Sequence, residues 1–303
     1  MAAYPSSSAR PFAAVLWMLL TGALFVAVTA VVKHVGSDIP APEAAFLRYA
    51  LGLVFLLPMI RPMLRVGMDR SAMKLFGLRG AAHAIGVMLW FYAMTQIPIA
   101  EVTAMGYITP VNVTIAAAIF LGEKLAVRRI AAIGFALLGA LIILRPGIRE
   151  VSGGHLAMLA NGVLFATSYL IAKIMADRVP ASVVVGWLSI IVTLVLAPFA
   201  IAVWVWPTAE DVAWLFLVAA LATTGHYTMT LALRAAPIAV TQPVTFLQLV
   251  WATLLGALVF AEAVDAWVIF GGALIMGSVS FITWREAVLK RRAVTPVVNE
   301  TKV

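Results

Sequence analysis

The sequence contains no cysteine and very little charge. Without cysteine it offers neither a disulfide framework nor a thiolate metal site. Only 11% of its 303 residues are Asp, Glu, Lys or Arg, whereas 64% are hydrophobic. A soluble domain carries roughly 25% charged residues, and no water-soluble fold of this length can bury so large an apolar fraction. The composition therefore excludes a soluble domain and indicates a protein embedded in a lipid bilayer.

The net charge of +8 would suggest nucleic-acid binding on a soluble protein. Here, however, Lys and Arg form short clusters between apolar runs, which is how membrane proteins use them. The sequence also lacks a G-x-x-x-x-G-K-[ST] segment, the loop that cradles ATP phosphates. We therefore expect no nucleic-acid partner, no required ATPase partner, no cofactor and no metal.

Ten apolar runs are long enough to cross the membrane. A helix needs about 20 mostly apolar residues to span roughly 30 Å of hydrocarbon. The first run is longer than the apolar region of a cleavable signal peptide, and nine runs follow it, so we expect it to be retained. We place the spans near residues 12–32, 44–60, 80–100, 102–122, 127–145, 155–173, within 179–209, and at 212–233, 235–261 and 266–284.

The basic residues predict the orientation of these spans. With ten spans both termini lie on one side, and 17 of the 21 Lys and Arg residues, Arg79 among them, fall on that side. The opposite side holds Lys33, Arg145 and Arg149, and Arg48 lies within a span. Because short cytoplasmic loops carry the excess of basic residues, we expect both termini in the cytoplasm and the chain in a bacterial inner membrane.

The second half of the chain repeats the first at an offset of about 140 residues. Five helices in each half force the second half to insert upside down, and inverted repeats that meet near the midplane are the architecture of secondary transporters. We predict an all-α membrane protein of ten transmembrane helices, with repeats at 12–147 and 148–285 and cytoplasmic tails at 1–11 and 286–303. The matching residues are Lys33 and Lys173, Pro40 and Pro180, Pro58 and Pro198, Pro98 and Pro237, and Glu123 and Glu262.

Polar and aromatic side chains inside the spans form stripes that the repeat duplicates. Polar groups in a span usually face the bundle interior or a water-filled cavity, so we predict a central cavity for a small solute. The alternative is that they form hydrogen bonds between packed helices. The two histidines could couple protons or recognise a carboxylate, or be structural. The candidate solute-binding residues are Thr21, Phe25, His83, Trp90, Tyr107, Asn161, Phe165, Tyr169, His226 and Gln242.

Four charged residues are assigned structural roles. We predict an ion pair between Arg48 and Glu101, with a clamp on a substrate carboxylate as the functional alternative for Arg48. Glu123 and Glu262 each precede the fifth helix of a repeat and are predicted to cap it. Since no Asp or Glu lies near a predicted midplane, facilitated diffusion competes with proton-driven antiport.

Several segments resemble the EamA branch of the drug/metabolite transporter superfamily. They are residues 43–48 (EAAFLR), 98–100 (PIA) and 121–123 (LGE), with a second copy in residues 237–239 (PIA), Glu262 and Gly271-Gly272. The resemblance implies a small-molecule carrier, with export of aromatic amino acids as the first interpretation. Uptake of riboflavin or S-adenosylmethionine is the alternative that it equally allows.

Two other classes of membrane protein are less well supported. A membrane-embedded enzyme would need a clustered metal set or a Ser–His pair, and the sequence has no H-E-x-x-H or G-x-S-x-G segment. A selective channel would show rings of charge or filter loops, which are not visible. We therefore expect a non-enzymatic carrier that acts as a monomer or weak dimer.

Overall fold

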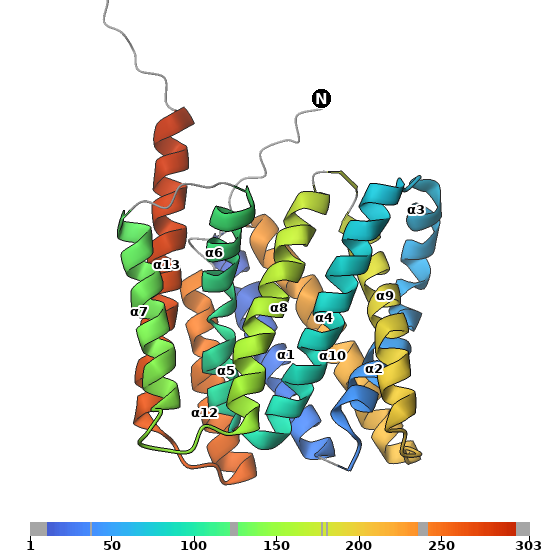
Figure 1. Cartoon of the computed structure of the whole chain (residues 1–303), viewed down its shortest axis with the longest axis horizontal. Coiled ribbons are helices and arrows are strands. Elements are labelled where there is room, and N and C mark those ends of the chain that lie inside the picture. The colour runs from blue at the N-terminus through green and yellow to red at the C-terminus, as the bar shows by residue number, and fades with distance from the viewer. Residues whose placement is uncertain are drawn as a thin grey trace, which may run out of the picture.

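The computed structural model describes residues 11–36, 38–121, 127–176, 178–179, 181–235 and 242–294. Within these ranges all regular elements are helices, apart from one isolated bridge between Pro146 and Arg149. The helices stand side by side in one bundle (Figure 1). The predicted all-helical membrane protein is thereby confirmed, although the number of unbroken spans differs from the prediction.

The first half begins with two long membrane-crossing helices separated by a broken segment. Asp69 starts the second of them, because its side chain accepts a hydrogen bond from the backbone N–H of Ala72 at 2.6 Å. The elements are α1 (Pro11–Val35), α2 (Ala41–Gly52), the 3-10 helix η1 (Leu53–Met59), α3 (Ile60–Arg65), α4 (Arg70–Gln96), α5 (Ile99–Gly106), α6 (Thr109–Leu121) and α7 (Val127–Leu144).

The second half repeats this order with the opposite sense across the bundle. In Figure 1, α1 begins and α13 ends at the upper end, whereas α8, the counterpart of α1, begins at the lower end. The inverted arrangement predicted from the odd number of crossings is therefore confirmed. The elements are α8 (Gly153–Ala176), α9 (Ala181–Ala202), α10 (Ala209–Ala235), η2 (Gln242–Thr245), α12 (Phe246–Phe260) and α13 (Ala266–Val294).

Eight of the described segments are long and apolar enough to cross a membrane when α5 and α6 are counted together, and α12 is a shorter apolar helix. The predicted span 44–60 is divided between α2 and η1, and the span 102–122 is broken between α5 and α6. Pro58 lies near the end of η1, and Pro110 is the second residue of α6; proline cannot donate the backbone hydrogen bond that continues a helix. Counting uncharged residues predicted the runs but missed these breaks.

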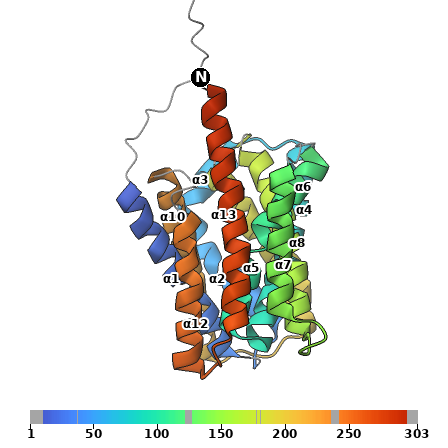
Figure 2. The ribbon, with the colours of Figure 1, turned by 90° about the vertical axis from the view of Figure 1, so that its left-hand side faces the viewer.

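Helices of the two halves pack against each other in equivalent pairs. The helix α1 packs along α10, and its counterpart α8 packs along α4. Each pair thus joins the first helix of one half to the third predicted span of the other. Figure 2 shows the third close pair, α7 beside α13, on one side of the bundle.

Two glycines allow α7 and α13 to approach closely. A Cβ atom on Gly139 would lie 2.6 Å from the carbonyl oxygen of Gly271, and a Cβ atom on Gly271 would lie 2.6 Å from that of Gly139. Small residues at helix crossings let backbones meet within membranes, where van der Waals packing drives association. The reciprocal contact joins the fifth helices of the two halves.

Candidate functional site

A cluster of polar and aromatic side chains surrounds His83 in the middle of α4. Its Nε2 atom is hydrogen-bonded to the Tyr49 hydroxyl at 3.0 Å, and its Nδ1 atom to the Ser168 hydroxyl at 3.2 Å. The imidazole also stacks on the Phe165 ring, with centroids 4.7 Å apart and an angle of 16°. Because α2, α4 and α8 all contribute, both halves of the chain build this cluster.

A second ring pair lies beside the first, on α1 and α10. Phe25 meets His226 edge to face, with centroids 5.1 Å apart. His226 lies close enough to His83 to act on it electrostatically, although the two residues belong to different halves. The repeat explains the arrangement, because Phe25 and Phe165 are 140 residues apart and occupy equivalent positions.

Two side chains of this region are exposed. The Tyr169 side chain follows Phe165 by one helical turn and is 44% exposed, and His226 is also exposed. Tyr169 nevertheless interacts electrostatically with Tyr49 and Arg79, which come from other helices. An exposed side chain among packed helices is what a space for a solute between the two halves requires.

Two arginines reach the same interior. Arg48 lies over the ring of Tyr49, with its guanidinium carbon 4.1 Å from the centroid. Arg79 donates a hydrogen bond from NH1 to the carbonyl of Val184 at 2.8 Å and is only 6% exposed. The span predicted at 80–100 began just after Arg79, whereas α4 begins at Arg70, so Arg79 lies within the helix one turn before His83.

Thr21 and Asn161 hold helices together in this state. The Thr21 and Thr228 hydroxyls are 2.8 Å apart between α1 and α10, and the Asn161 side chain donates to the Gly86 carbonyl at 2.7 Å between α8 and α4. Both residues are buried, and they occupy equivalent repeat positions. These bonds match the packing alternative, and a role in solute binding stays a prediction.

The remaining predicted solute-binding residues are Trp90, Tyr107 and Gln242. Trp90 packs edge to face on Phe91 at 5.9 Å within the large apolar core. The Tyr107 hydroxyl donates to the Thr245 carbonyl at 3.0 Å, and its side chain is 9% exposed. Gln242 begins η2, and its side chain lies outside the described part of the chain. Their part in a cavity also stays a prediction.

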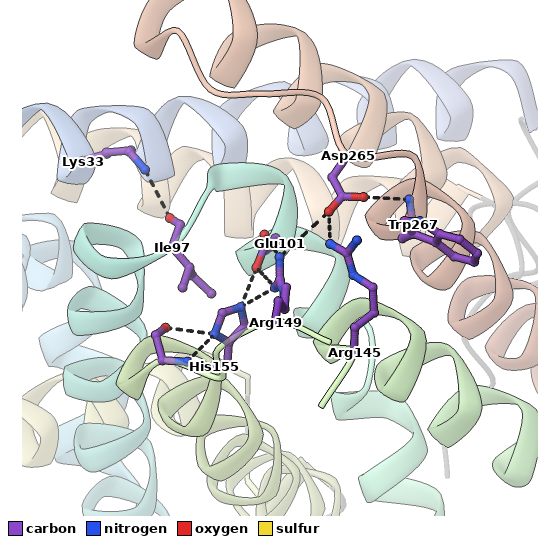
Figure 3. A network of polar contacts seen from close by, with 9 residues as sticks. Lys33, Ile97, Glu101, Arg145, Arg149, His155, Asp265 and Trp267 are labelled. Carbon is purple, nitrogen blue, oxygen red and sulfur yellow. Dashed lines mark hydrogen bonds and ion pairs between the residues drawn. The ribbon is translucent and has the colours of Figure 1, made fainter. Parts of the chain in front are cut away.

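A polar network joins the two halves at the lower end of the bundle, near the start of α8 (Figure 3). Glu101 on α5 accepts two hydrogen bonds from the Arg149 guanidinium, at 2.9 and 2.6 Å. His155 lies 2.6 Å from the same carboxylate. The hydrogen bonds to Glu101 raise the pKa of Arg149 above its ordinary value, so its guanidinium stays charged beside the carboxylate.

The ion pair that we predicted between Arg48 and Glu101 is wrong. Glu101 is occupied by Arg149 and His155, whereas Arg48 packs on Tyr49. The prediction considered only charges within or next to the spans and treated Arg149 as a loop residue in water. The loop between α7 and α8 instead places Arg149 beside the first turn of α5, where it meets the carboxylate.

Two further ion pairs lie at the same end. Arg145, at the end of α7, is paired with Asp265, which also accepts a hydrogen bond from the Trp267 backbone N–H at 2.9 Å and so caps α13. Lys33 is paired with Glu262. The basic residues predicted on the outer side are therefore each neutralised by a carboxylate of the opposite half.

Glu262 does cap a helix, but not the one we predicted. Its carboxylate accepts a hydrogen bond from the backbone N–H of Ile99, the first residue of α5, at 2.9 Å. The predicted target was α13, whose cap is Asp265. The inverted arrangement explains the difference, since it brings the end of α12 to the start of α5. Glu123, the counterpart of Glu262, lies outside the described residues.

Ser152, His155 and Glu101 form a chain of polar contacts that was not predicted from the sequence. The Ser152 hydroxyl lies 2.8 Å from His155 Nδ1, and His155 Nε2 lies 2.6 Å from Glu101. Yet the Ser152 backbone N–H also donates to Nδ1, at 3.1 Å, directly before α8. A side chain three residues on that reaches back to the N-cap N–H is a capping box. The local role of this set is to start α8.

A family model matches the chain twice. The description "EamA-like transporter family" applies to residues 12–145 and again to residues 152–284. The two matches together cover most of the chain, one in each half.

Curated transporters are similar over nearly the full length. A riboflavin transporter of Rhizobium johnstonii is 28% identical, over 93% of this chain and 95% of its own length. An S-adenosylmethionine uptake transporter of Rickettsia prowazekii is 24% identical, over 84% and 86%. A pseudopaline exporter of Pseudomonas aeruginosa is 25% identical, over 86% and 93%. Their names differ in both solute and direction.

Proposed function

The chain belongs to the EamA-like transporter family, and from this premise we propose that it is a secondary carrier for a small solute with a flat ring. The proposal depends mainly on one observation, the His83 imidazole stacked on Phe165 beside the exposed Tyr169. Flat, rigid rings offer large contact area to another ring at little cost in conformational entropy. A ring-bearing solute would find such surfaces from both halves.

Export of an aromatic amino acid is the first candidate. Arg48, over the ring of Tyr49, and Arg79, one helical turn before His83, bring positive charge to this cluster, and a carboxylate is their natural partner. A solute with net positive charge, such as S-adenosylmethionine, would be repelled by the same groups. Riboflavin is the second candidate, favoured by the similarity to riboflavin transporters.

Alternating access would proceed by rocking one half against the other. Inverted repeats around a midplane site support this mode of movement. The pairs Arg149–Glu101, Arg145–Asp265 and Lys33–Glu262 tie the two halves at one end. We infer that this is the outer end and that it is closed in the present state, so that a solute loads from the cytoplasm.

Cysteine labelling tests whether the interior site is open to water. Because the chain has no cysteine, Tyr169→Cys introduces a single thiol at a side chain that is 44% exposed. We expect a small hydrophilic thiol reagent to modify it, and L-tryptophan or riboflavin to slow the reaction. Mass spectrometry of the purified protein measures the modified fraction.

Leu141→Cys is the matched control for this labelling. Leu141 lies on α7 and is 52% exposed on the outside of the bundle, where lipid would exclude the reagent and keep the thiol protonated. Tyr169→Cys that reacts no faster than Leu141→Cys would contradict an open site between the halves.

The orientation in the membrane has its own test. From the excess of basic residues on one side, we propose that both termini are cytoplasmic and that the membrane is the bacterial inner membrane. A fluorescent reporter that folds only in the cytoplasm, fused after Val303, should be bright, and a phosphatase fused there should be inactive. An active phosphatase would reverse the orientation.

A further inference from the structure

In the part of the chain that the structure describes, two guanidinium groups of the bundle interior have no anionic partner. Within the described residues, Arg48 makes no hydrogen bond or ion pair, and its contact is the face of Tyr49. Arg79 makes a single hydrogen bond, to a carbonyl. The Nε atoms of both residues are buried without a hydrogen-bond partner.

Two guanidinium groups without an anionic partner destabilise the bundle unless an anion binds beside them. Charged side chains in a membrane interior pair with one another or mark the path of a substrate or ion, and a buried charge without a partner is strongly destabilising. The carboxylate on the helix that carries Arg48 is Glu43, which accepts a hydrogen bond from the Val205 backbone N–H instead. Glu101, Asp265 and Glu262 are held in the network at the lower end.

The two arginines converge on the site that holds the rings. Arg48 lies over the ring of Tyr49, whose hydroxyl is hydrogen-bonded to His83, and Arg79 precedes His83 by one turn of α4. They belong to α2 and α4, whereas the stacking ring, Phe165, belongs to α8. An anion placed beside the stacked rings would therefore meet positive charge from two helices.

We infer that Arg48 and Arg79 form a subsite for an anionic group on the transported solute. This inference rests on the proposed function, since it assumes that the ring of the solute lies at Phe165. A carboxylate and a phosphate both match the planar fork of a guanidinium. The subsite thus distinguishes anionic solutes from neutral ones that share a ring.

Ligand binding to the purified full-length protein tests the subsite with two pairs of probes. Each pair shares one ring system and differs in charge: 3-phenylpropionate against 3-phenylpropionamide, and flavin mononucleotide against riboflavin. We expect the anionic member of at least one pair to bind about tenfold more tightly, as hydrogen bonds to charged groups warrant. A preference within the first pair alone identifies a carboxylate solute, and one within the second alone a phosphate.

Substitutions test whether Arg48 and Arg79 cause the preference for the anionic probe. Arg79→Gln and Arg48→Gln should each reduce it to within about twofold while leaving affinity for the neutral members nearly unchanged, and Arg79→Lys should retain most of it. Arg70→Gln, on the exposed first residue of α4, is the control and should change nothing. If Arg79→Gln does not fold, Arg48→Gln and Arg79→Lys still decide the outcome.

The two proposals fail in different ways. Equal affinity for the members of both pairs, or an anion preference that survives both glutamine substitutions, would overturn the subsite and leave the ring site standing. Butyrate, an anion without a ring, separates the other case: if butyrate binds as tightly as 3-phenylpropionate, the ring contributes nothing. That result would contradict the proposed function while leaving the anion subsite intact.

Discussion

Replacing Arg149 with alanine is expected to lower the free energy of unfolding by about 3 kcal/mol, the cost of leaving a buried carboxylate without its cation. The Glu101 side chain is 5% exposed and receives two hydrogen bonds from Arg149. Only His155 would remain beside it. Chemical unfolding of the purified protein in detergent, followed by tryptophan fluorescence, measures the loss.

A double variant tests whether this loss of stability comes from the contact between Arg149 and Glu101. Arg149→Ala combined with Glu101→Gln removes the stranded charge and should recover a large part of the stability. Arg128→Ala, on the exposed first turn of α7, should stay within about 0.5 kcal/mol of the original protein. A double variant no more stable than Arg149→Ala alone would show that the pairing does not hold the halves together.

Replacing Gly139 with alanine is expected to be similarly damaging, although it adds a single methyl group. The new Cβ atom would lie 2.6 Å from the Gly271 carbonyl oxygen and 2.7 Å from Ile275 Cγ1. A backbone atom cannot move aside as the end of a side chain can, so α7 and α13 must separate. Overpacking of this kind costs about 3 kcal/mol, which the same unfolding measurement would detect.

The same helix supplies the control. Gly134 also lies in α7, but a Cβ atom there would have no neighbour within 4 Å. Gly134→Ala should leave stability unchanged or raise it by about 0.5 kcal/mol, because alanine favours the helix more than glycine does. If both variants behave alike, the close crossing of α7 and α13 does not stabilise the fold.

Composition and periodicity predicted most of the architecture because the bilayer imposes simple rules. A span must be apolar and about 20 residues long, so uncharged runs revealed the helices. The repeated positions of Phe25 and Phe165 likewise predicted equivalent surfaces, and these meet the two histidines. The prediction missed the helix breaks near Pro58 and Pro110, because the apolar runs continue there although the helix geometry changes.

The ionic contacts were harder to predict because their partners are far apart in the chain. Glu101 and Arg149 are 48 residues apart, and Arg145 and Asp265 are 120 residues apart. One signal was available: the three basic residues that break the charge bias, Lys33, Arg145 and Arg149, each need a nearby carboxylate. The number of carboxylates was visible in the sequence, but their assignment required the inverted packing of the halves.

The position of Arg79 was also difficult to predict from the sequence. Its position next to a cluster of basic residues suggested a loop at the membrane surface, and only the start of α4 at Arg70 places it inside. Tyr49 and Ser168, which hold His83, were also missed. Neither residue belongs to a sequence motif, and their role follows only from their hydrogen bonds to the two ring nitrogens of His83.

Counterflow in proteoliposomes tests the central claim, a carrier with one site for a ring-bearing solute, most directly. Vesicles that contain the purified protein are preloaded with unlabelled L-tryptophan or riboflavin and diluted into a trace of the same labelled solute. We expect transient, saturable accumulation of label above its equilibrium level, because a carrier exchanges solute through a site that faces one side at a time. Uptake that does not saturate and is unaffected by preloading would contradict the account.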